Sequence, residues 1–309
     1  MRGGRPAQLV LGSVQLGLAY GAANRSGKPA RPVALRLLQR AAEAGVTSFD
    51  TARSYGDAEE RLGDALKGRN VRTTTKLAPL TDLSPDASRD MVRAAVDKSI
   101  VDSQKALKRD VLDCVLLHRA AHRTAFKGAI WRRLKEHVVQ GTIDSLGVSV
   151  QNPEEARDAL ADASVRHLQL PYNLLDWRWQ GAGVIAEIVK RKDVTIHARS
   201  VFLQGVLVAE DASVWPRIAG VDAPAVIAWL NEKARAFGCG SVADLCLGYV
   251  RGQSWIDGVV IGMETEDQLE ANLALVARAP LSPQDCSLIE ARRPHLPAAL
   301  LDPAQWPWR

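Results

Sequence analysis

The segment FDTARSYGDAEERLG, residues 49–63, holds two residue types that can handle a proton. Asp50 ends a short apolar run, and Tyr55 follows in a Ser-Tyr-Gly turn, just before a helix expected from Asp57. A carboxylate at the end of a buried strand is costly unless a cation or a set of N–H groups meets it. The rest of the chain must therefore supply a partner for Asp50.

Two further apolar runs end on residues that suit this task. RTTTKLAP ends its β-branched run on Lys76, and VLDCVLLHRA ends its run on His118. The ammonium of Lys76 would neutralise Asp50 beneath the phenol of Tyr55, where a cation lowers the tyrosine pKa from about 10. Such a phenol can exchange a proton with a substrate oxygen near neutral pH. His118 can orient the same oxygen.

These residues need a fold that gathers strand ends, and the order of elements predicts one. Apolar runs alternate with helical segments along the chain, and strands are expected near 8–14, 46–51, 71–77, 111–118, 143–150, 166–172, 194–201 and 256–262. Eight strands alternating with helices favour a single (β/α)8 TIM barrel, whose active site lies at the carboxyl ends of the strands. A doubly wound sheet is the alternative, but LVLGSVQLGLAYG lacks the GxGxxG spacing that it usually carries.

The helices between these strands have recognisable start signals. Helices are expected to begin at the N-caps Ser84, Asn152 and Thr265, and another over 32–44 stops at Gly45. The region 202–255 is expected to hold an extended loop and two helices. We expect one domain over 1–309, with a core of 9–277 and a C-terminal tail of 278–309.

Composition narrows the classes of function. Forty Lys and Arg against 35 Asp and Glu give a net charge of +5, and no stripe alternates basic and aromatic residues, so we expect no nucleic-acid partner. No apolar stretch approaches the roughly 18 residues of a membrane span. The four cysteines show no CxxC and the histidines no metal-binding spacing, which predicts a reduced, cytoplasmic protein without a metal site. Cys114 is expected in the core.

Asp50, Tyr55, Lys76 and His118, in this order and each at or just after a strand end, resemble the catalytic tetrad of the aldo-keto reductases. GTIDSLGVSVQNPEE is similar to the family's fifth-strand motif Gly–Val–Ser–Asn, and LQLPYNLLD resembles its sixth-strand Gln-x-x-Tyr-Asn. IGMETEDQLEAN is similar to its adenosine-phosphate segment. The resemblance covers residues 9–277.

The resemblance implies an oxidoreductase that moves hydride between a nicotinamide and the carbonyl carbon of an aldehyde, ketone or sugar. Tyr55 would be the general acid and base, tuned by Lys76 and Asp50, with His118 positioning the carbonyl. An NAD(P)(H) site is implied at Ser149 and Gln169 for the carboxamide, Ser200, Phe202 and Gly205 for the pyrophosphate, and Gly262, Gln268 and Asn272 for the adenosine.

Three positions depart from the family pattern. Val150 replaces an asparagine that usually helps to hold the carboxamide. Arg199 stands where many members stack an aromatic ring on the nicotinamide, and a guanidinium plane can also stack. Glu264 lies where NADP-preferring relatives often place a base, so we expect NAD(H) to be preferred over NADP(H), with Arg217 as a base that could reach the same site.

Four tryptophans lie near the expected barrel mouth. Trp177 and Trp179 follow the sixth strand, either as walls of a substrate pocket or as a structural cover. Trp306 and Trp308 lie in the proline-broken tail, which would fold over the mouth, form a subunit contact or stay disordered. The expected partner is a small carbonyl or sugar substrate, and the oligomeric state stays open.

Two other functions fit parts of the pattern. Lys76 at a barrel strand end could form a Schiff base, as in a class I aldolase, with Asp50 and Tyr55 transferring protons. A non-catalytic nicotinamide sensor similar to the potassium-channel β subunits is the other alternative. The full tetrad favours the reductase over inert binding.

Overall fold

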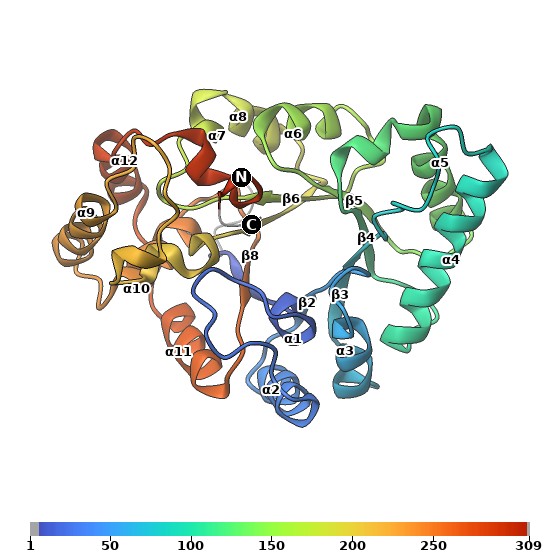
Figure 1. Cartoon of the computed structure of the whole chain (residues 1–309), viewed down its shortest axis with the longest axis horizontal. Helices are drawn as coiled ribbons and strands as arrows, with labels where there is room; N and C mark the ends of the chain where they lie inside the picture. The colour runs from blue at the N-terminus through green and yellow to red at the C-terminus, as the bar shows by residue number, and fades with distance from the viewer. Residues whose placement is uncertain (1–5, 308–309) are drawn as a thin grey trace.

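Eight parallel strands close on themselves in chain order in the computed structural model, which describes residues 6–307 (Figure 1). The strands are β1 (Gln8–Gly12), β2 (Ser48–Asp50), β3 (Arg72–Lys76), β4 (Cys114–Leu117), β5 (Leu146–Ser149), β6 (His167–Pro171), β7 (Thr195–Arg199) and β8 (Gly258–Gly262). Strand β1 pairs with both β2 and β8, so the sheet has no free edge. The predicted TIM barrel is confirmed, and every strand falls inside its predicted range.

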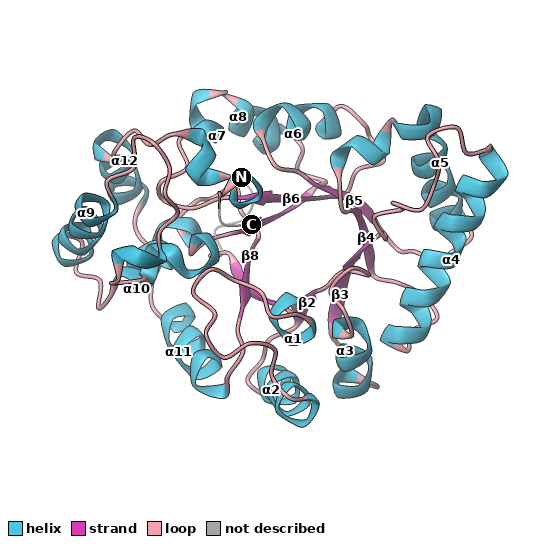
Figure 2. Cartoon of the chain, in the orientation of Figure 1, coloured by secondary structure: helices cyan, strands magenta, loops and turns pink. Residues whose placement is uncertain are grey.

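Helices surround this barrel, as Figure 2 shows. They are α1 (Val14–Gly17), α2 (Arg31–Glu43), α3 (Ala58–Leu66), α4 (Arg89–Leu107), α5 (Ala125–Val139), α6 (Pro153–Leu160), α7 (Arg178–Gly181), α8 (Val184–Lys190), α9 (Ala223–Ala236), α10 (Val242–Arg251), α11 (Glu266–Ala277) and α12 (Pro283–Arg292). Because α11 packs against α2, the last βα unit meets the first. The 202–255 region holds the two predicted helices, α9 and α10.

Strand β4 is apolar on both faces, as expected for a strand that helices cover on the outside and packed side chains cover on the inside. Val115, Leu116 and Leu117 of β4 are all fully buried, and Cys114 joins them as the expected core residue. Burial raises the pKa of the Cys114 thiol to about 12, so it stays protonated.

Two of the three predicted helix caps are correct. The Asn152 side chain accepts a hydrogen bond from Glu155 N at 2.9 Å, and Thr265 Oγ1 accepts one from Gln268 N at 3.2 Å. The prediction for Ser84 is wrong, because α4 begins one turn later and Ser88 caps it by accepting from Met91 N. Residues 84–87 instead form a turn closed by Ala87 N and Ser84 O, with proline at its second position.

The C-terminal segment after α12 runs back toward the barrel mouth through two short 3₁₀ turns, Ala298–Leu301 and Pro303–Gln305. Trp306 is buried, and its indole N–H donates to Leu300 O at 3.0 Å. Trp306 therefore packs onto the rest of the protein, as in the first of the three outcomes expected for the tail. Trp308 lies outside the described residues.

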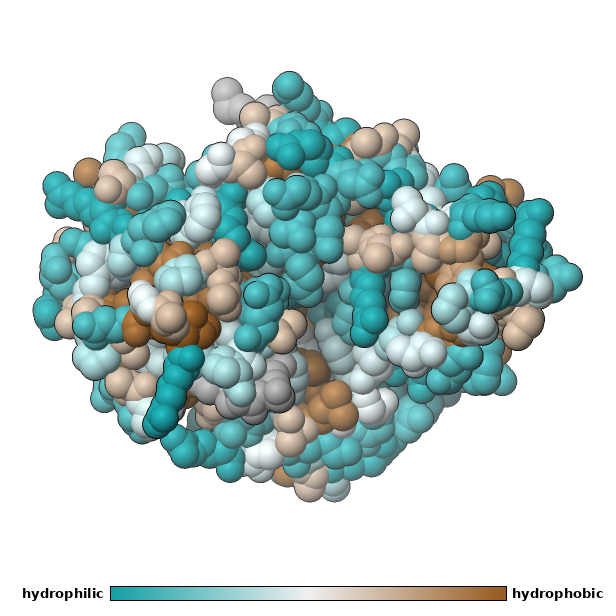
Figure 3. Space-filling model, turned by 45° about the horizontal axis from the view of Figure 1, so that its top comes forward, coloured by the Kyte–Doolittle hydropathy of each residue, from teal (hydrophilic) through white to brown (hydrophobic). Residues whose placement is uncertain are grey.

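The face of the molecule in Figure 3 is hydrophilic over most of its area, with hydrophobic residues in separate small areas. Within residues 6–307, no helix is both long and apolar enough to cross a membrane.

Candidate active site

A buried ion pair joins the ends of β2 and β3. Lys76 Nζ donates to Asp50 Oδ1 at 2.6 Å and to Thr51 O at 3.0 Å, and Lys76 is only 1% exposed. The other carboxylate oxygen, Asp50 Oδ2, accepts from Gln169 Nε2 at 2.7 Å. Burial alone would lower the pKa of Lys76, but the charge of Asp50 and its hydrogen bond raise that pKa above its ordinary value. The carboxylate thus has its cation, and the pair is neutral as a unit.

Tyr55 lies directly above this pair. Lys76 Nζ is 5.1 Å from the centre of the phenol ring, and the ring of His118 meets it edge-on at 5.7 Å. We expected the cation to lower the tyrosine pKa, but the net shift is upward. Burial raises the pKa of Tyr55 more than the charges of Lys76 and Arg199 lower it, and Asp50 adds to the rise. Burial therefore favours the protonated phenol of Tyr55 in this structure.

His118 completes the group as a neutral ring. Burial, followed by the nearby positive charges of Lys76 and Arg199, lowers its pKa to about 3. Its Nδ1 lies 3.3 Å from Ser54 Oγ, a contact that joins the loop after β4 to the loop after β2.

Close backbone packing fixes the loop that carries Tyr55. Gly17, at the end of α1, leaves no room for a side chain, because a Cβ there would collide with the Tyr55 carbonyl oxygen. Gly56 has φ +57°, and a Cβ there would collide with Gly17 O. Only glycine meets both demands at Gly56. The height of the phenol is therefore set by the βα loop after β1 as well as by its own loop.

A cleft of about 560 Å³ opens above these residues at the carboxyl ends of the strands. Of the tetrad, Asp50, Tyr55 and His118 line it, while Lys76 lies beneath. All ten residues expected to bind a cofactor also line it: Ser149, Gln169, Arg199, Ser200, Phe202, Gly205, Gly262, Glu264, Gln268 and Asn272. One cleft therefore connects the tetrad with the start of α11.

The cleft offers polar groups that fit a dinucleotide. Ser13 Oγ and Gln15 Oε1 lie in its wall, buried and without a hydrogen-bond partner among the described residues. Such orphaned groups are normally satisfied by a ligand or by water. Gln169 turns its amide nitrogen to Asp50, so its oxygen would be the atom left for a nicotinamide carboxamide. Val150 does not line the cleft, and its carbonyl oxygen accepts from Arg199 Nη2 at 3.0 Å.

The far end of the cleft is the N-terminus of α11. Gln268 Oε1 accepts from Glu264 N at 2.7 Å, which fixes the turn before the helix. Arg36 of α2 reaches Glu266 at 3.5 Å and so balances one of the acids of this segment. Glu264 forms no ion pair with a described residue, and Arg217 is exposed and does not line the cleft.

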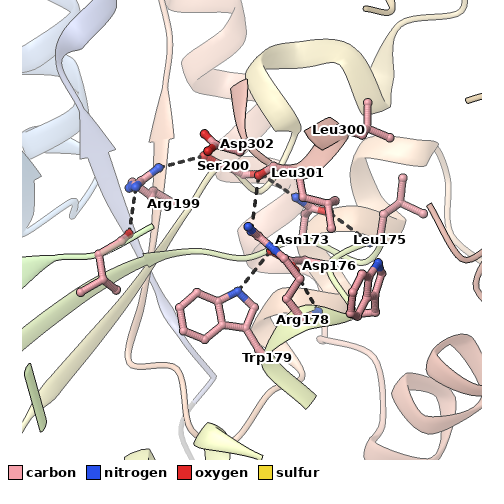
Figure 4. A network of polar contacts seen from close by, with 12 residues as sticks. Asn173, Leu175, Asp176, Arg178, Trp179, Arg199, Ser200, Leu300, Leu301 and Asp302 are labelled. Carbon is pink, nitrogen blue, oxygen red and sulfur yellow. Dashed lines mark hydrogen bonds and ion pairs between the residues drawn. The ribbon is translucent and has the colours of Figure 1, made fainter. Parts of the chain in front are cut away.

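The structure does not bring Trp177 and Trp179 to the cleft. Trp179 is fully buried, and its indole N–H donates to Asp176 Oδ2 at 3.1 Å (Figure 4). Trp177 donates to Leu296 O at 2.9 Å and packs on the ring of His295. Trp177 thus contacts the C-terminal segment and Trp179 packs in the core, which agrees with the structural alternative for both rings.

Some residues of the cleft lie in loops and could not be predicted from the residues at the strand ends. Tyr20 and Asn24 enter it from the loop after β1, and Gln151 enters from the loop after β5. Ser54, which contacts His118, was missed for the same reason. A Tyr-Gly pair at residues 20–21, like the one at 55–56, was the available signal for the first of these loops.

The fold and the cleft define an α/β barrel protein with a strand-end tetrad. A model of the Aldo/keto reductase family matches residues 8–293, and the chain belongs to this family. Its curated relatives include an aldo-keto reductase of Strobilurus tenacellus, 30% identical over 57% of this chain, and this chain spans 52% of that relative's length. The L-glyceraldehyde 3-phosphate reductase of Escherichia coli K12 is 23% identical over 82% of each chain. The holo form of an aldo-keto reductase from Bacillus halodurans shares the fold at a TM-score of 0.74, with 21% identity over 94% of this chain and 93% of that one.

Proposed function

We propose that the protein is a nicotinamide-dependent carbonyl reductase in which Tyr55 delivers the proton. One observation carries the proposal: a protonated phenol stands over a neutral ion pair, beside a neutral imidazole, in the wall of a long cleft. A dinucleotide held along this cleft would supply the hydride. The named residues of the cleft wall would hold it, with Ser13 and Gln15 as further contacts.

The chain's own residues divide the remaining work. The Tyr55 O–H would donate to the carbonyl oxygen and give up its proton as negative charge develops there. Lys76, held by Asp50, stabilises the resulting phenolate through space. His118, neutral at physiological pH, would offer Nε2–H to the same oxygen without competing as an acid. Because the phenol is protonated in the resting site, we propose reduction as the direction that needs no prior proton loss.

The substrate class proposed is a small aldehyde, ketone or sugar. Relatives whose names include L-glyceraldehyde 3-phosphate reductase and 6-dehydroglucose reductase support this range. We propose NAD(H) over NADP(H), because Glu264 faces the far end of the cleft without a paired base, and a cytoplasmic location, which rests on the cysteine pattern of the sequence.

The Schiff-base alternative is disfavoured by Lys76 itself. An amine must be unprotonated and reachable to attack a carbonyl, whereas Lys76 is buried, paired with Asp50 and raised in pKa.

The deciding experiment is quenching of tryptophan fluorescence by NADH and NADPH, followed by turnover on a panel of aldehydes, ketones and aldoses. Binding together with oxidation of the reduced cofactor supports the reductase. Binding without turnover on any carbonyl would leave a nicotinamide sensor, and borohydride trapping of a substrate on Lys76 without cofactor binding would leave an aldolase.

A further inference from the structure

Arg199 places a positive charge at the reacting end of the cleft. Arg199 is the last residue of β7 and pairs with Pro171 of β6. Its side chain reaches across β6 to the end of β5, where Nη2 donates to Val150 O at 3.0 Å. Nη1 makes one longer contact, 3.4 Å, with Ser200 Oγ (Figure 4). Of the five N–H groups of the guanidinium, these two contacts use only a part.

No carboxylate of the described residues forms an ion pair with this guanidinium. Asp50 is held by Lys76 and Gln169. Asp302, which is drawn next to Ser200 in Figure 4, accepts from Gln305 Nε2 at 2.8 Å. Glu264 lines the same cleft and is not within ion-pair distance of Arg199.

The summed charge of the tetrad and Arg199 is therefore not zero. Asp50 and Lys76 neutralise each other, while Tyr55 and His118 are neutral. Burial lowers the pKa of Arg199 from its ordinary value, with the nearby tyrosines and carboxylates acting against it, yet arginine keeps its proton in proteins. The reacting end therefore carries a net positive charge of one unit, on a partly exposed guanidinium that has no carboxylate partner among the described residues.

We propose that Arg199 selects carbonyl substrates that carry an anionic group, a carboxylate or a phosphate, close to the carbonyl. The inference rests on the proposed reductase function and adds a substrate class to it. A guanidinium meets the oxygens of either group with paired N–H donors. Its charge already acts on Tyr55, Lys76 and His118, so an anion bound there would hold its own carbonyl within the tetrad.

The test compares substrates that differ in charge and little else. We would measure kcat/KM for 4-carboxybenzaldehyde against 4-carbamoylbenzaldehyde, and for glyceraldehyde 3-phosphate against glyceraldehyde. The wild-type protein should favour at least one anionic member by roughly tenfold or more, the range of a charge-assisted hydrogen bond. The pair that discriminates names the group, carboxylate or phosphate. Equal kcat/KM within both pairs overturns the proposal.

Three variants assign the preference to the guanidinium. Arg199→Gln should bring kcat/KM for the anionic member of the discriminating pair down to the value for its neutral partner, and Arg199→Lys should restore part of the preference. The matched control is Arg119→Gln, which removes an exposed positive charge next to His118 outside the cleft and should keep the preference. A preference for the anionic substrate that persists in Arg199→Gln contradicts the proposal. If that variant also binds NADH and NADPH more weakly, the guanidinium would be assigned to the cofactor phosphates instead.

A binding measurement keeps this inference separate from the reductase proposal. Calorimetry with 4-carboxybenzyl alcohol and 4-carbamoylbenzyl alcohol, with and without NAD⁺, does not depend on reduction of a carbonyl. Tighter binding of the carboxylate by wild type and not by Arg199→Gln supports the anion site even if no carbonyl is reduced. Equal binding of the two alcohols, with neutral aldehydes still reduced, leaves the reductase in place and removes the anion site.

Discussion

At the scale of single residues, the candidate site combines groups whose environments hold each in one protonation state. The phenol of Tyr55 is kept protonated by burial, and the imidazole of His118 is kept neutral by burial and by two cations. In the proposed reaction, these settings would make Tyr55 the proton donor and His118 a hydrogen-bond donor only. The ion pair of Lys76 and Asp50 matters once the phenol loses its proton.

Tyr55→Phe removes the transferable proton and keeps the ring. Because general acid catalysis is worth roughly 10²–10⁴-fold, we expect kcat to fall by that factor. Titration of tryptophan fluorescence with NADH should show cofactor binding unchanged. A variant that keeps half of the wild-type kcat would remove Tyr55 from the mechanism.

We expect that His118 causes no inflection in the pH–rate profile near neutral pH. Its pKa is lowered from 6.5 to about 3, so the ring stays neutral throughout the range in which a free histidine would titrate. The pKa of Tyr55 is raised above 10, so the acid also stays protonated there. We therefore expect kcat/KM for a neutral aldehyde to be flat around pH 6.5. An inflection at that pH which disappears in His118→Gln would contradict the neutral ring.

Lys76→Met should lower both activity and stability. Leaving Asp50 buried without its cation costs about 3–5 kcal/mol if the pair is fully buried, softened here by the bond from Gln169. The matched control is Lys98→Met. Lys98 forms an exposed i,i+4 ion pair with Asp102, so its loss should change the melting temperature and the activity little.

The sign of the pH dependence follows from the same pair. Because the folded-state pKa of Lys76 is raised, its contribution is fully present at neutral pH and is lost only as pH rises through that pKa. Lys76→Met lacks this contribution, so the difference in melting temperature from wild type should stay constant around neutral pH and shrink only as pH rises above the ordinary lysine pKa of about 10.4. A difference that shrinks near neutral pH would contradict the raised pKa of Lys76.

At the scale of elements, strand ends were predictable and loop geometry was not. The apolar runs place Asp50, Lys76 and His118 correctly, because a parallel barrel brings all carboxyl ends to one face. Ser84 failed as a cap because the following proline and aspartate suit a turn as well as a helix start. The side to which Trp179 turns depends on a buried aspartate that the spacing of residues does not reveal.

Gly17→Ala tests whether α1 sets the position of the tyrosine loop. The new Cβ would overlap Tyr55 O, so either the loop or α1 must shift, at a cost of typically about 1–3 kcal/mol. We expect a lower melting temperature and a fall in kcat that exceeds the change in NADH affinity. Gly181→Ala in α7 is the control, since its Cβ would meet only Trp177 at an ordinary 3.7 Å. Full activity in Gly17→Ala would show that the loop tolerates the shift.

At the scale of the whole molecule, closure of the barrel brings residues far apart in the chain to the cofactor end of the cleft. The segment GMETEDQLEAN alone contains acids and no base, which is why the sequence favours NAD(H). The fold adds what that segment cannot show: Arg36 and Arg40 of α2 pair with Glu266 and Glu270 of α11. Only Glu264 remains as an acid of the cleft wall without a described base against it.

Cofactor preference should follow this one side chain. A 2′-phosphate about 4 Å from a carboxylate near the surface is repelled by up to ~4 kcal/mol at an effective dielectric of 20, and even a third of that gives roughly tenfold discrimination. Parallel titrations at fixed ionic strength should show tighter binding of NADH than NADPH, and Glu264→Arg should shift the preference toward NADPH. Glu270→Arg, outside the cleft on the same helix, should leave the ratio unchanged. Tighter NADPH binding by the wild-type protein would mean that the N–H groups at the start of α11 attract the phosphate more strongly than Glu264 repels it.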